Sequence, residues 1–330
     1  MRIGVIGAGA IGGTVAALLH TSGHEVEVTA RGAHLAAIRE GGIRLEGAFG
    51  DVTAPVVANE VLTGAADLVI LATKAQDASD ALAANAAIVS GTRLLVIQNG
   101  LDGIANARRE TAATDVVGGL AMYAASYLSP GEIRITTPGV TYLSAPVPEL
   151  AEAMPTTIVR NFVGAQWTKL FVNQVNALPA ITGLSVQEVA ASQPLLNVLT
   201  RSMQENVRIG HARLVRYVNL NGVGDALLSL FELLPSGISS ALPAYLARRM
   251  GEVPNPGSTL QSIKRGQATE VDYLNGAVVV RAQALGKDAP VNAALVDLVH
   301  EVERTGVFLT PAEVLAGVPR PRLRGLSRRD

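Results

Sequence analysis

Residues 1–13 read MRIGVIGAGAIGG, a short apolar run that leads directly into closely spaced glycines. Ile3 to Ile6 predict a buried strand, and the glycines match the G-x-G-x-x-G pattern of dinucleotide-binding turns. In this pattern Gly7 permits a tight turn, Gly9 lets the backbone approach a pyrophosphate, and Gly12 lets the following helix lie close to the strand. We assign the cofactor-binding loop to Gly7, Ala8, Gly9, Ala10, Ile11 and Gly12.

The segments around these glycines strengthen the prediction, since a glycine motif alone is weak evidence. A helix rich in alanine and leucine is predicted from Thr14 to Leu19, and a second strand from Glu25 to Thr29. Together they make a βαβ unit of about 30 residues, in which the N–H groups at the start of the helix face a bound anion. This context favours nucleotide binding; the alternative is a glycine-rich turn in an unrelated α/β protein.

The end of the second strand indicates which dinucleotide is bound. Where NAD is preferred, an Asp or Glu about 20 residues past the glycines binds the ribose 2′-hydroxyl, whereas an Arg accommodates a 2′-phosphate. Here the strand ends in Thr29-Ala30-Arg31-Gly32, with no carboxylate at its tip. The planar guanidinium of Arg31 suits a phosphate. We therefore expect NADP(H) rather than NAD(H); the alternative is that Arg31 is a solvated loop residue.

The composition indicates a folded protein of two domains. The chain has 330 residues, of which 48% are hydrophobic, enough for two cores of ordinary size. A net charge of −1 gives no basis for binding nucleic acid or an anionic membrane, and the basic cluster from Arg320 to Arg329 predicts a solvated tail. No uninterrupted apolar run reaches the roughly 18 residues of a membrane span. Residues 1–13 also lack the basic start and cleavage site of a signal peptide, so we expect a cytoplasmic protein.

Apolar runs and alanine-rich segments alternate in the first half of the chain. This alternation predicts a doubly wound parallel sheet with helices on both faces. The strands that we predict are Ile3–Ile6, Glu25–Thr29, Asp67–Ala72 and Arg93–Ile97. Between Asp115 and Ser144 the pattern changes to short segments broken by turns, which predict antiparallel strands that close the first domain.

The second half of the chain is predicted to be helical. The expected helices are Gln166–Ile181, Pro194–Val218, Asp225–Leu234, Thr259–Lys264, Asp272–Leu285 and Val291–Thr305. We place the domain boundary near residue 165. The first domain, residues 1–165, is then a Rossmann-type unit that binds NADP, and the second, residues 166–330, is a helical substrate and dimerisation domain.

Three polar segments make the chain similar to a known family. Gln98-Asn99-Gly100-Leu101 follows the fourth strand, residues 167–178 read WTKLFVNQVNAL, and residues 257–276 read GSTLQSIKRGQATEVDYLNG. In this order, behind GAGAIGG, they resemble the ketopantoate reductase (2-dehydropantoate 2-reductase) family over most of the chain. The resemblance implies a doubly wound Rossmann-type domain followed by an all-helical domain, as in 6-phosphogluconate-dehydrogenase-like folds.

Lys169 is the candidate for the proton donor that a ketone reductase needs. It lies among Trp167, Leu170 and Phe171 on a predicted amphipathic helix, so its ammonium is expected to point into a partly apolar cleft. Burial of this kind lowers the pKa of a lysine and makes it a usable general acid. The alternative is a lysine that extends to solvent. The resemblance implies that Lys169 is the catalytic proton donor.

The substrate side chains include one departure from the family. Asn173 shares a helix face with Lys169 and could hydrogen-bond the substrate hydroxyl or carbonyl. Family members commonly carry a second Asn eight residues after the lysine, but this chain has Ala177 there and Asn176 one position earlier. A shift by one residue rotates a helical side chain by about 100°. Either the helix is locally irregular and presents Asn176, or one substrate contact is absent.

Further residues take their expected roles from the resemblance. Ser258 is expected to bind the substrate carboxylate at the start of a helix, where it could equally be a plain N-cap, and Asn255 is a weaker substrate candidate. Glu270 is expected near Lys169 or the nicotinamide ribose, with a surface ion pair as the alternative. Asn99 is expected to bind this ribose and the substrate, and Lys74 the cofactor; a loop lysine would otherwise mean little.

The resemblance implies NADPH-dependent reduction of 2-dehydropantoate to pantoate, in which the C2 ketone receives a hydride and Lys169 gives the proton. The alternatives are a reductase of another 2-oxo acid, aromatic acids included, and a non-catalytic protein that senses NADPH. A proton donor and a carboxylate site in one chain favour an enzyme. No metal is expected, because the chain has no cysteine and its histidines lack metal-binding spacing. A homodimer through the helical half is also expected.

Overall fold

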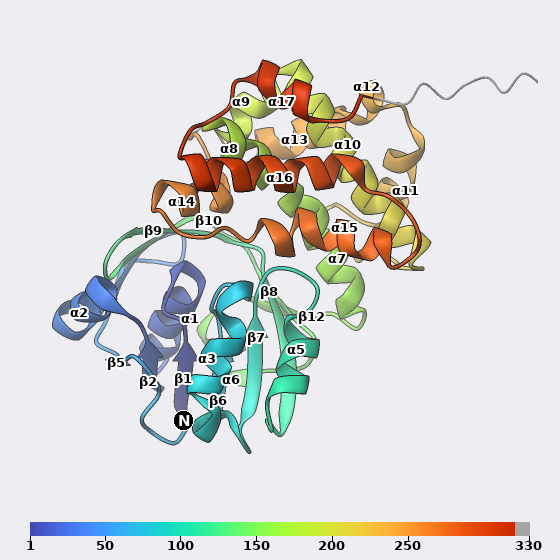
Figure 1. Cartoon of the computed structure of the whole chain (residues 1–330). Helices are drawn as coiled ribbons and strands as arrows, with labels where there is room; N and C mark the ends of the chain where they lie inside the picture. Colours follow the sequence, from blue (N-terminus) through green and yellow to red (C-terminus); the bar gives the residue numbers. More distant parts are fainter. Residues whose placement is uncertain (252, 321–330) are drawn as a thin grey trace, which may run out of the picture. The chain divides into compact units, whose positions relative to one another are not determined.

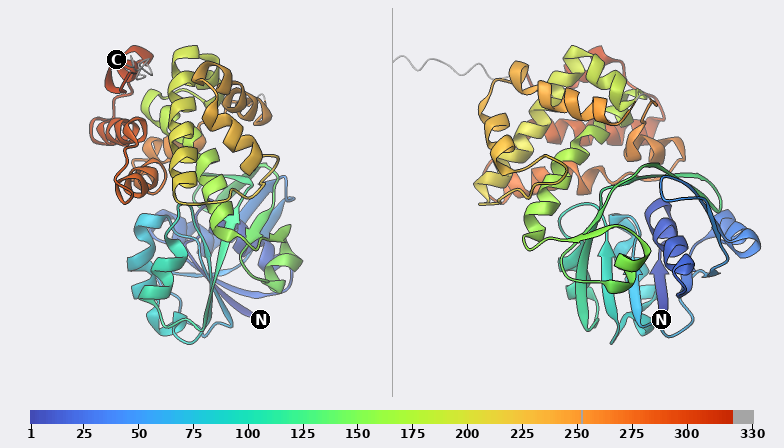
Figure 2. Two further views of the ribbon diagram at one scale, coloured as in Figure 1. Left: turned by 90° about the vertical axis from the view of Figure 1, so that its right-hand side faces the viewer. Right: turned by 180° about the vertical axis from the view of Figure 1, so that it is seen from behind.

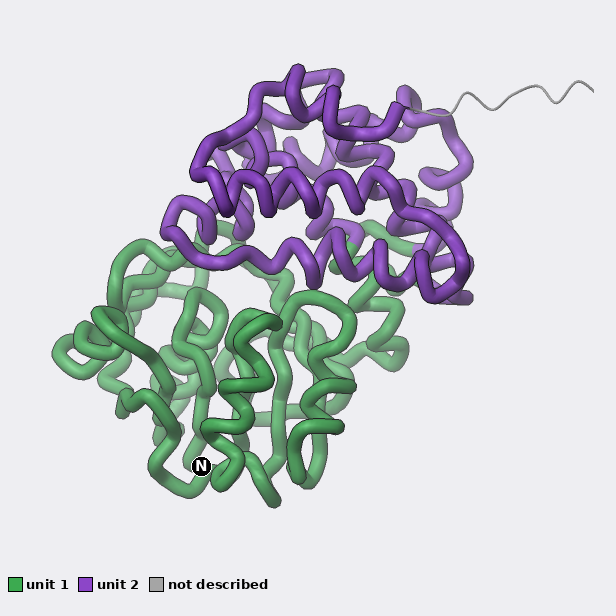
Figure 3. The backbone as a smooth tube through the Cα atoms, viewed as in Figure 1, with its two compact units in different colours: residues 1–170, 217–224 green, residues 171–216, 225–330 purple. Residues whose placement is uncertain are grey.

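The computed structural model describes residues 1–251 and 253–320. The chain forms two compact units (Figure 3). Unit 1 comprises Met1–Leu170 with Tyr217–Gly224, and unit 2 comprises Phe171–Arg216 with Asp225–Asp330. The basic tail predicted beyond Arg320 lies outside the described residues. Within these residues, no helix is both long enough and apolar enough to cross a membrane.

Unit 1 is built on an eight-stranded sheet in the order β12-β11-β8-β7-β6-β1-β2-β5 (Figure 1). Its strands, in chain order, are β1 (Arg2–Ile6), β2 (Glu25–Thr29), β5 (Val57–Asn59), β6 (Leu68–Leu71), β7 (Arg93–Ile97), β8 (Asp115–Ala121), β11 (Thr141–Leu143) and β12 (Thr156–Ile158). From β5 to β8 every neighbouring pair is parallel. The six strands from β5 to β8 have the 3-2-1-4-5-6 order of a Rossmann fold, which confirms the predicted fold class.

Helices cover both faces of this sheet (Figure 2). The helices of unit 1 are α1 (Ala10–Thr21), α2 (Gly32–Gly41), η1 (Ala75–Asp77), α3 (Ala78–Ala84), α4 (Ala86–Val89), α5 (Gly103–Glu110), α6 (Pro148–Ala153) and most of α7 (Phe162–Asn173). Leu68 and Ile70 of β6 belong to one core cluster, with residues of α1 and α6. Val69 and Leu71 belong to the other, with residues of α3 and α5. A parallel strand buried on both faces reads as an unbroken apolar run, which explains why β6 was predictable.

The segment between Asp115 and Ser144 corrects one prediction. Its first strand, β8, extends the parallel sheet beside β7 instead of opening an antiparallel hairpin, and its residues after Asp115 are all buried. Within this segment, antiparallel pairing is confined to β11 against β8 and to a hairpin in a second sheet. That second sheet has the order β4-β3-β10-β9 and consists of β4 (Val52–Ala54), β3 (Ile43–Gly47), β10 (Glu132–Thr137) and β9 (Ala124–Ser129).

Unit 2 is helical in its described residues. Its elements are η2 (Gln174–Asn176), α8 (Ala177–Thr182), α9 (Val186–Ala191), α10 (Gln193–Ala212), α11 (Asp225–Leu233), α12 (Ser236–Ser239), α13 (Ala241–Arg249), α14 (Gly257–Lys264), η3 (Val271–Tyr273), α15 (Asn275–Gln283), α16 (Pro290–Thr305) and α17 (Pro311–Gly317). The helix predicted over 166–181 is interrupted by the 3₁₀ turn η2.

The helix predicted over 194–218 ends earlier than expected, at Ala212. The chain then returns to unit 1, where the ring of Tyr217 packs edge-on against Trp167 with centroids 6.4 Å apart. The hydroxyl of Thr168 donates to the carbonyl of Val218 over 2.8 Å. These long-range contacts replace the continued helix, and no local sequence pattern encodes them.

Candidate active site

The glycine loop between β1 and α1 is held by the end of β2. Gly7 has a φ of +96°, which favours glycine, and its N–H donates to Thr29 Oγ1 over 2.9 Å. The Ala8 N–H donates to the Thr29 carbonyl, also over 2.9 Å. A Cβ on Gly12 would lie 2.0 Å from the Gly7 carbonyl oxygen, so helix and loop are in the close contact that the motif predicts.

Gly9 faces open space, in contrast to Gly7 and Gly12. A Cβ placed on it would meet no atom within 4 Å. The Gly9 carbonyl accepts from the Gly13 N–H over 2.7 Å, so the first turn of α1 starts at this residue. A backbone surface that is uncovered at the start of a helix fits the pyrophosphate of a dinucleotide.

Arg31 follows β2 by two residues and is the N-cap residue of α2. Its side chain is exposed. The residue therefore lies at the carboxyl end of a strand next to β1, where a Rossmann fold binds the ribose of its dinucleotide.

The loops after β6 and β7 are joined through Gln98. Its Nε2 donates to the Thr73 carbonyl over 3.0 Å, so the segments that carry Lys74 and Asn99 lie side by side. The side chains of Lys74 and Asn99 are both half-buried. Gln166 of α7 donates to the Gly100 carbonyl over 3.4 Å, which joins α7 to the same loop.

Lys169 lies in the part of α7 that belongs to unit 1. Its Nζ donates to the Ala121 carbonyl over 2.9 Å, and Ala121 is the last residue of β8. The Lys169 side chain is half-buried. The structure thus places the ammonium at the carboxyl end of the parallel sheet, the edge where Rossmann folds bind their ligands.

Three predicted substrate residues of unit 2, Asn173, Asn176 and Ser258, are joined by hydrogen bonds, and a fourth, Asn255, is bonded to Gly257. Asn176 accepts from the Ser258 N–H at its Oδ1 over 3.1 Å, and its Nδ2 donates to the Asn173 carbonyl over 3.0 Å. Asn255 Oδ1 accepts from the Gly257 N–H over 2.9 Å. The irregularity considered for the helix exists as η2, and it directs the Asn176 side chain to the start of α14.

Buried polar side chains form hydrogen bonds with Gln174 of η2. They were not predicted from the sequence. Gln174 accepts at Oε1 from Ser202 Oγ over 2.6 Å and from Asn275 Nδ2 over 2.7 Å. Asn275 Nδ2 also lies 3.0 Å from the Oδ1 of Asn292. All four side chains are almost completely inaccessible. The sequence could have indicated these four side chains, because each is a polar residue at a position where helix periodicity predicts an apolar one.

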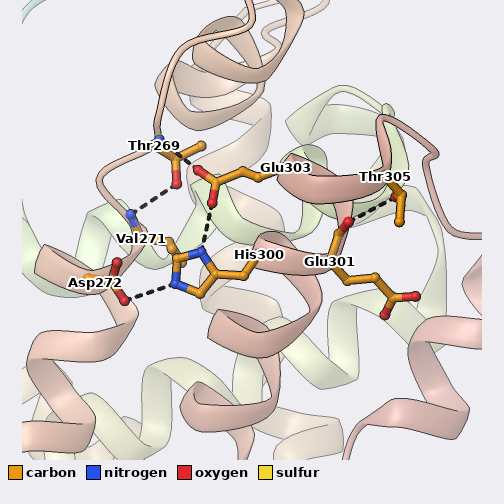
Figure 4. Close-up of polar contacts among 7 residues, drawn as sticks. All are labelled: Thr269, Val271, Asp272, His300, Glu301, Glu303 and Thr305. Atoms are coloured by element: carbon orange, nitrogen blue, oxygen red, sulfur yellow. Dashed lines mark hydrogen bonds and ion pairs between the residues drawn. The ribbon is translucent and has the colours of Figure 1, made fainter.

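Glu270 follows Thr269 in a turn that is bonded to α16 by a second polar cluster. Figure 4 shows the members of this cluster, Thr269, Asp272, His300 and Glu303. Glu303 of α16 accepts from the Thr269 N–H over 2.7 Å, and its other oxygen lies 2.7 Å from His300 Nδ1. His300 Nε2 lies 3.1 Å from Asp272 Oδ1. Burial would lower the pKa of His300, but the hydrogen bonds with Glu303 and Asp272 raise it above its usual value. The cluster therefore flanks half-buried Glu270 on both sides.

The predicted site residues fall into two groups. The glycine loop, Arg31, Lys74, Asn99 and Lys169 are in unit 1, and Asn173, Asn176, Asn255, Ser258 and Glu270 are in unit 2. Within each unit the structure brings residues together that are far apart in the sequence. Sequence reasoning missed His300 and Glu303, although their spacing of three on one helix was visible.

Sequence comparisons match both halves of the chain to one family. The model for the ketopantoate reductase PanE/ApbA matches residues 3–147, and the model for its C terminal part matches residues 161–303. The 2-dehydropantoate 2-reductase of Halobacterium salinarum is 30% identical, over 93% of this chain and 100% of its own. The enzyme of the same name from Pyrococcus horikoshii is 28% identical, over 93% and 99%.

Solved structures agree with this result. A PanE/ApbA family ketopantoate reductase from Ralstonia eutropha JMP134 is 28% identical, with a TM-score of 0.79 over 92% of this chain and 99% of its own. A D-mandelate dehydrogenase solved with NADH and anilino(oxo)acetate has a TM-score of 0.77 over 92% and 99%, and its identity of 21% shows the fold alone. Fold, site and matches define a nicotinamide-dependent oxidoreductase of two domains. The chain belongs to the ketopantoate reductase family.

Proposed function

We propose that this protein reduces 2-dehydropantoate to pantoate with NADPH, and that Lys169 donates the proton. The observation that carries the proposal is the position of Lys169 Nζ, 2.9 Å from the Ala121 carbonyl at the carboxyl end of β8. Bound NADPH supplies the hydride that goes to the C2 carbon of the ketone. The carbonyl π electrons then move to oxygen, and a Lys169 N–H proton neutralises the forming alkoxide. A positive charge that is already in place beside the forming alkoxide oxygen lowers the free-energy barrier of the reduction.

NADPH is proposed over NADH because of Arg31. Its exposed guanidinium follows the end of β2, and no carboxylate stands at the strand tip to bind a free 2′-hydroxyl. Lys74 and Asn99, at the ends of the two neighbouring strands, are proposed to bind the phosphate and the nicotinamide ribose. These roles assign residues 1–165 to cofactor binding and residues 166–330 to substrate binding and dimerisation.

The substrate is proposed to bind through the amides and hydroxyl near α14. Ser258 is exposed at the start of this helix, and its hydroxyl, next to the positive end of the helix dipole, is proposed to bind the carboxylate. Asn173 and Asn255, with Asn99, are proposed to hydrogen-bond the hydroxyl and carbonyl groups of the substrate. Glu270 is proposed to hold the lysine in its charged form or to accept from a ribose hydroxyl.

A second candidate is the reduction of another 2-oxo acid, and the position of Asn176 favours it. The Asn176 amide oxygen is used by the Ser258 N–H, so this side chain replaces the usual family asparagine only in part. The loss of one hydrogen bond to the substrate hydroxyl changes how strongly the enzyme prefers 2-oxo acids that carry this hydroxyl over those that lack it.

The test is NADPH oxidation by the purified protein with 2-dehydropantoate and a panel of aliphatic and aromatic 2-oxo acids, with NADH in parallel. Efficient turnover of 2-dehydropantoate with NADPH supports the proposal, whereas preference for another acid supports the second candidate. NADPH binding without turnover of any acid contradicts both and supports an NADPH sensor. Light scattering tests the proposed homodimer, and fractionation of cells the proposed cytoplasmic location.

A further inference from the structure

We infer that His34 is a positioning residue for the cofactor, which aims the Gly9 amide at the pyrophosphate by holding the carbonyl of Ala8. The inference rests on the proposed binding of a dinucleotide by the glycine loop. His34 is the third residue of α2 and lies three positions after Arg31. No motif of the dinucleotide fingerprint includes it.

The two ring nitrogens of His34 have different partners, both of them backbone groups. Nε2 lies 2.7 Å from the Ala8 carbonyl oxygen, and Nδ1 lies 3.0 Å from the Gly131 nitrogen. A carbonyl can only accept and a backbone N–H can only donate. The two contacts therefore require a neutral imidazole with its proton on Nε2. The ring is further packed edge-on against Tyr127, with centroids 5.0 Å apart.

The contact with Ala8 acts on Gly9 through the peptide bond. The Ala8 carbonyl and the Gly9 N–H belong to one planar peptide unit, and in the trans form they point in opposite directions. A carbonyl held by His34 therefore directs the Gly9 N–H away from α2. The preceding peptide is held as well, because the Ala8 N–H donates to the Thr29 carbonyl over 2.9 Å.

The open space around Gly9 leaves room for an anion to accept from the oriented Gly9 N–H. A Cβ on Gly9 would have no neighbour within 4 Å, so the backbone is uncovered there. An amide that already has the bound orientation does not have to reorganise when an anion binds. No binding free energy is then lost to ordering this amide, and the affinity is higher. The pyrophosphate is common to NADPH and NADH, so the effect must be equal for both.

The other contact joins His34 to the turn between β9 and β10. Gly131 lies in this turn with a φ of +80°, and its carbonyl accepts from the Arg44 N–H over 2.8 Å. Burial lowers the pKa of His34, in spite of the bond with Ala8, and so favours the neutral ring that both contacts need. The second sheet is thus connected through one side chain to the loop that binds the cofactor.

Paired amide substitutions separate the two contacts. The side-chain amide of His34→Gln can place its nitrogen where Nε2 lies and keep the bond to Ala8. His34→Asn can place its oxygen where Nδ1 lies and keep only the bond with Gly131. His20→Gln, in the last turn of α1 and away from the loop, is the matched control. We would measure the Kd of NADPH and of NADH by calorimetry, and kcat and both KM values by turnover.

His34→Asn is expected to raise the Kd of both cofactors about tenfold, because the Gly9 N–H is no longer oriented by the bond between residue 34 and the Ala8 carbonyl. Its kcat at saturating cofactor and its KM for the 2-oxo acid stay within about twofold of the wild type. His34→Gln is expected to restore most of the affinity. Equal Kd values for His34→Asn and the wild type would overturn the inference, as would a loss that His34→Gln shares in full. Failure of the wild type to bind either cofactor would instead overturn the proposed function.

Discussion

Lys169 is the residue on which the proposed chemistry depends. Its Nζ donates to the Ala121 carbonyl over 2.9 Å, and this bond fixes the position from which the lysine is proposed to give a proton. We expect Lys169→Ala to lower kcat by about 10²- to 10⁴-fold, the usual contribution of a general acid. The Kd of NADPH, measured by calorimetry, stays close to that of the wild type.

Lys287→Ala provides the control, because Lys287 is exposed in unit 2 after the end of α15. It is expected to leave kcat unchanged. Full turnover by Lys169→Ala would remove this residue from the catalytic role, whatever its effect on binding.

Arg31 is the side chain that we propose to determine the choice of cofactor. The extra phosphate of NADPH is the group that a guanidinium binds with charge-assisted hydrogen bonds. Arg31→Ala is therefore expected to raise the Kd of NADPH about 10- to 100-fold and that of NADH by less than about twofold. NADH serves as the internal control, and an equal loss for both cofactors would contradict the 2′-phosphate assignment.

At the scale of elements, close packing at the start of α14 constrains the region that we propose to bind the substrate. Gly257 has a φ of +70°, and a Cβ there would lie 2.6 Å from Asn176 Oδ1. Gly266, just after the other end of α14, has a φ of +62° but no neighbour within 4 Å of its added Cβ. The two glycines share the strain of a left-handed backbone and differ in the contact with Asn176.

We expect Gly266→Ala to lower the free energy of unfolding by about 1 kcal/mol, the cost of a left-handed alanine. Gly257→Ala is expected to cost about 1–3 kcal/mol more, because the Asn176 oxygen must move away from the Ser258 N–H. Its KM for the 2-oxo acid also rises. Chemical denaturation and turnover measure both effects, and equal losses for the two variants would show that the Asn176 contact is unimportant.

Elements were predictable where their burial is regular. The ends of β2 and β7 agree with the predicted strands because apolar side chains fill both faces or alternate cleanly. The short strands β3, β4 and β5 were missed, since three to five residues with mixed burial carry little periodicity. The turn η2 was predicted only as one of two alternatives, because the contacts around it are distant in the sequence: Ser202 and Asn275 bond to Gln174 from other helices. For the same reason the sequence identified Asn176 as a candidate but not its contact with Ser258.

At the scale of the whole molecule, the titration of His300 connects pH to stability. Burial by itself would lower the pKa of His300, but hydrogen bonds with the Glu303 and Asp272 carboxylates outweigh it and raise the pKa in the folded state. These are the charged groups that face the ring, one from its own helix and one from η3. The native protein therefore holds this proton more tightly than the unfolded chain, whose histidines titrate near 6.5.

The sign of the pH dependence is set by this difference in proton binding. Below the unfolded pKa both states carry the proton, so the stabilisation by the imidazolium is fully present. As the pH rises through the folded pKa the native state loses the proton, and the contribution disappears. The free energy of unfolding attributed to His300 thus falls with rising pH, in a window that starts near 6.5.

We therefore expect the wild type to be more stable than His300→Gln at about pH 6 and the difference to shrink by about pH 9. The effect is small, below about 1 kcal/mol, because the His300 side chain is 44% exposed and water screens its ion pairs. Urea denaturation across this range measures it, with His20→Gln as a control that removes a histidine of unit 1. Parallel curves for the wild type and His300→Gln would mean that Glu303 holds the Thr269 N–H and the turn with Glu270 without help from the imidazolium.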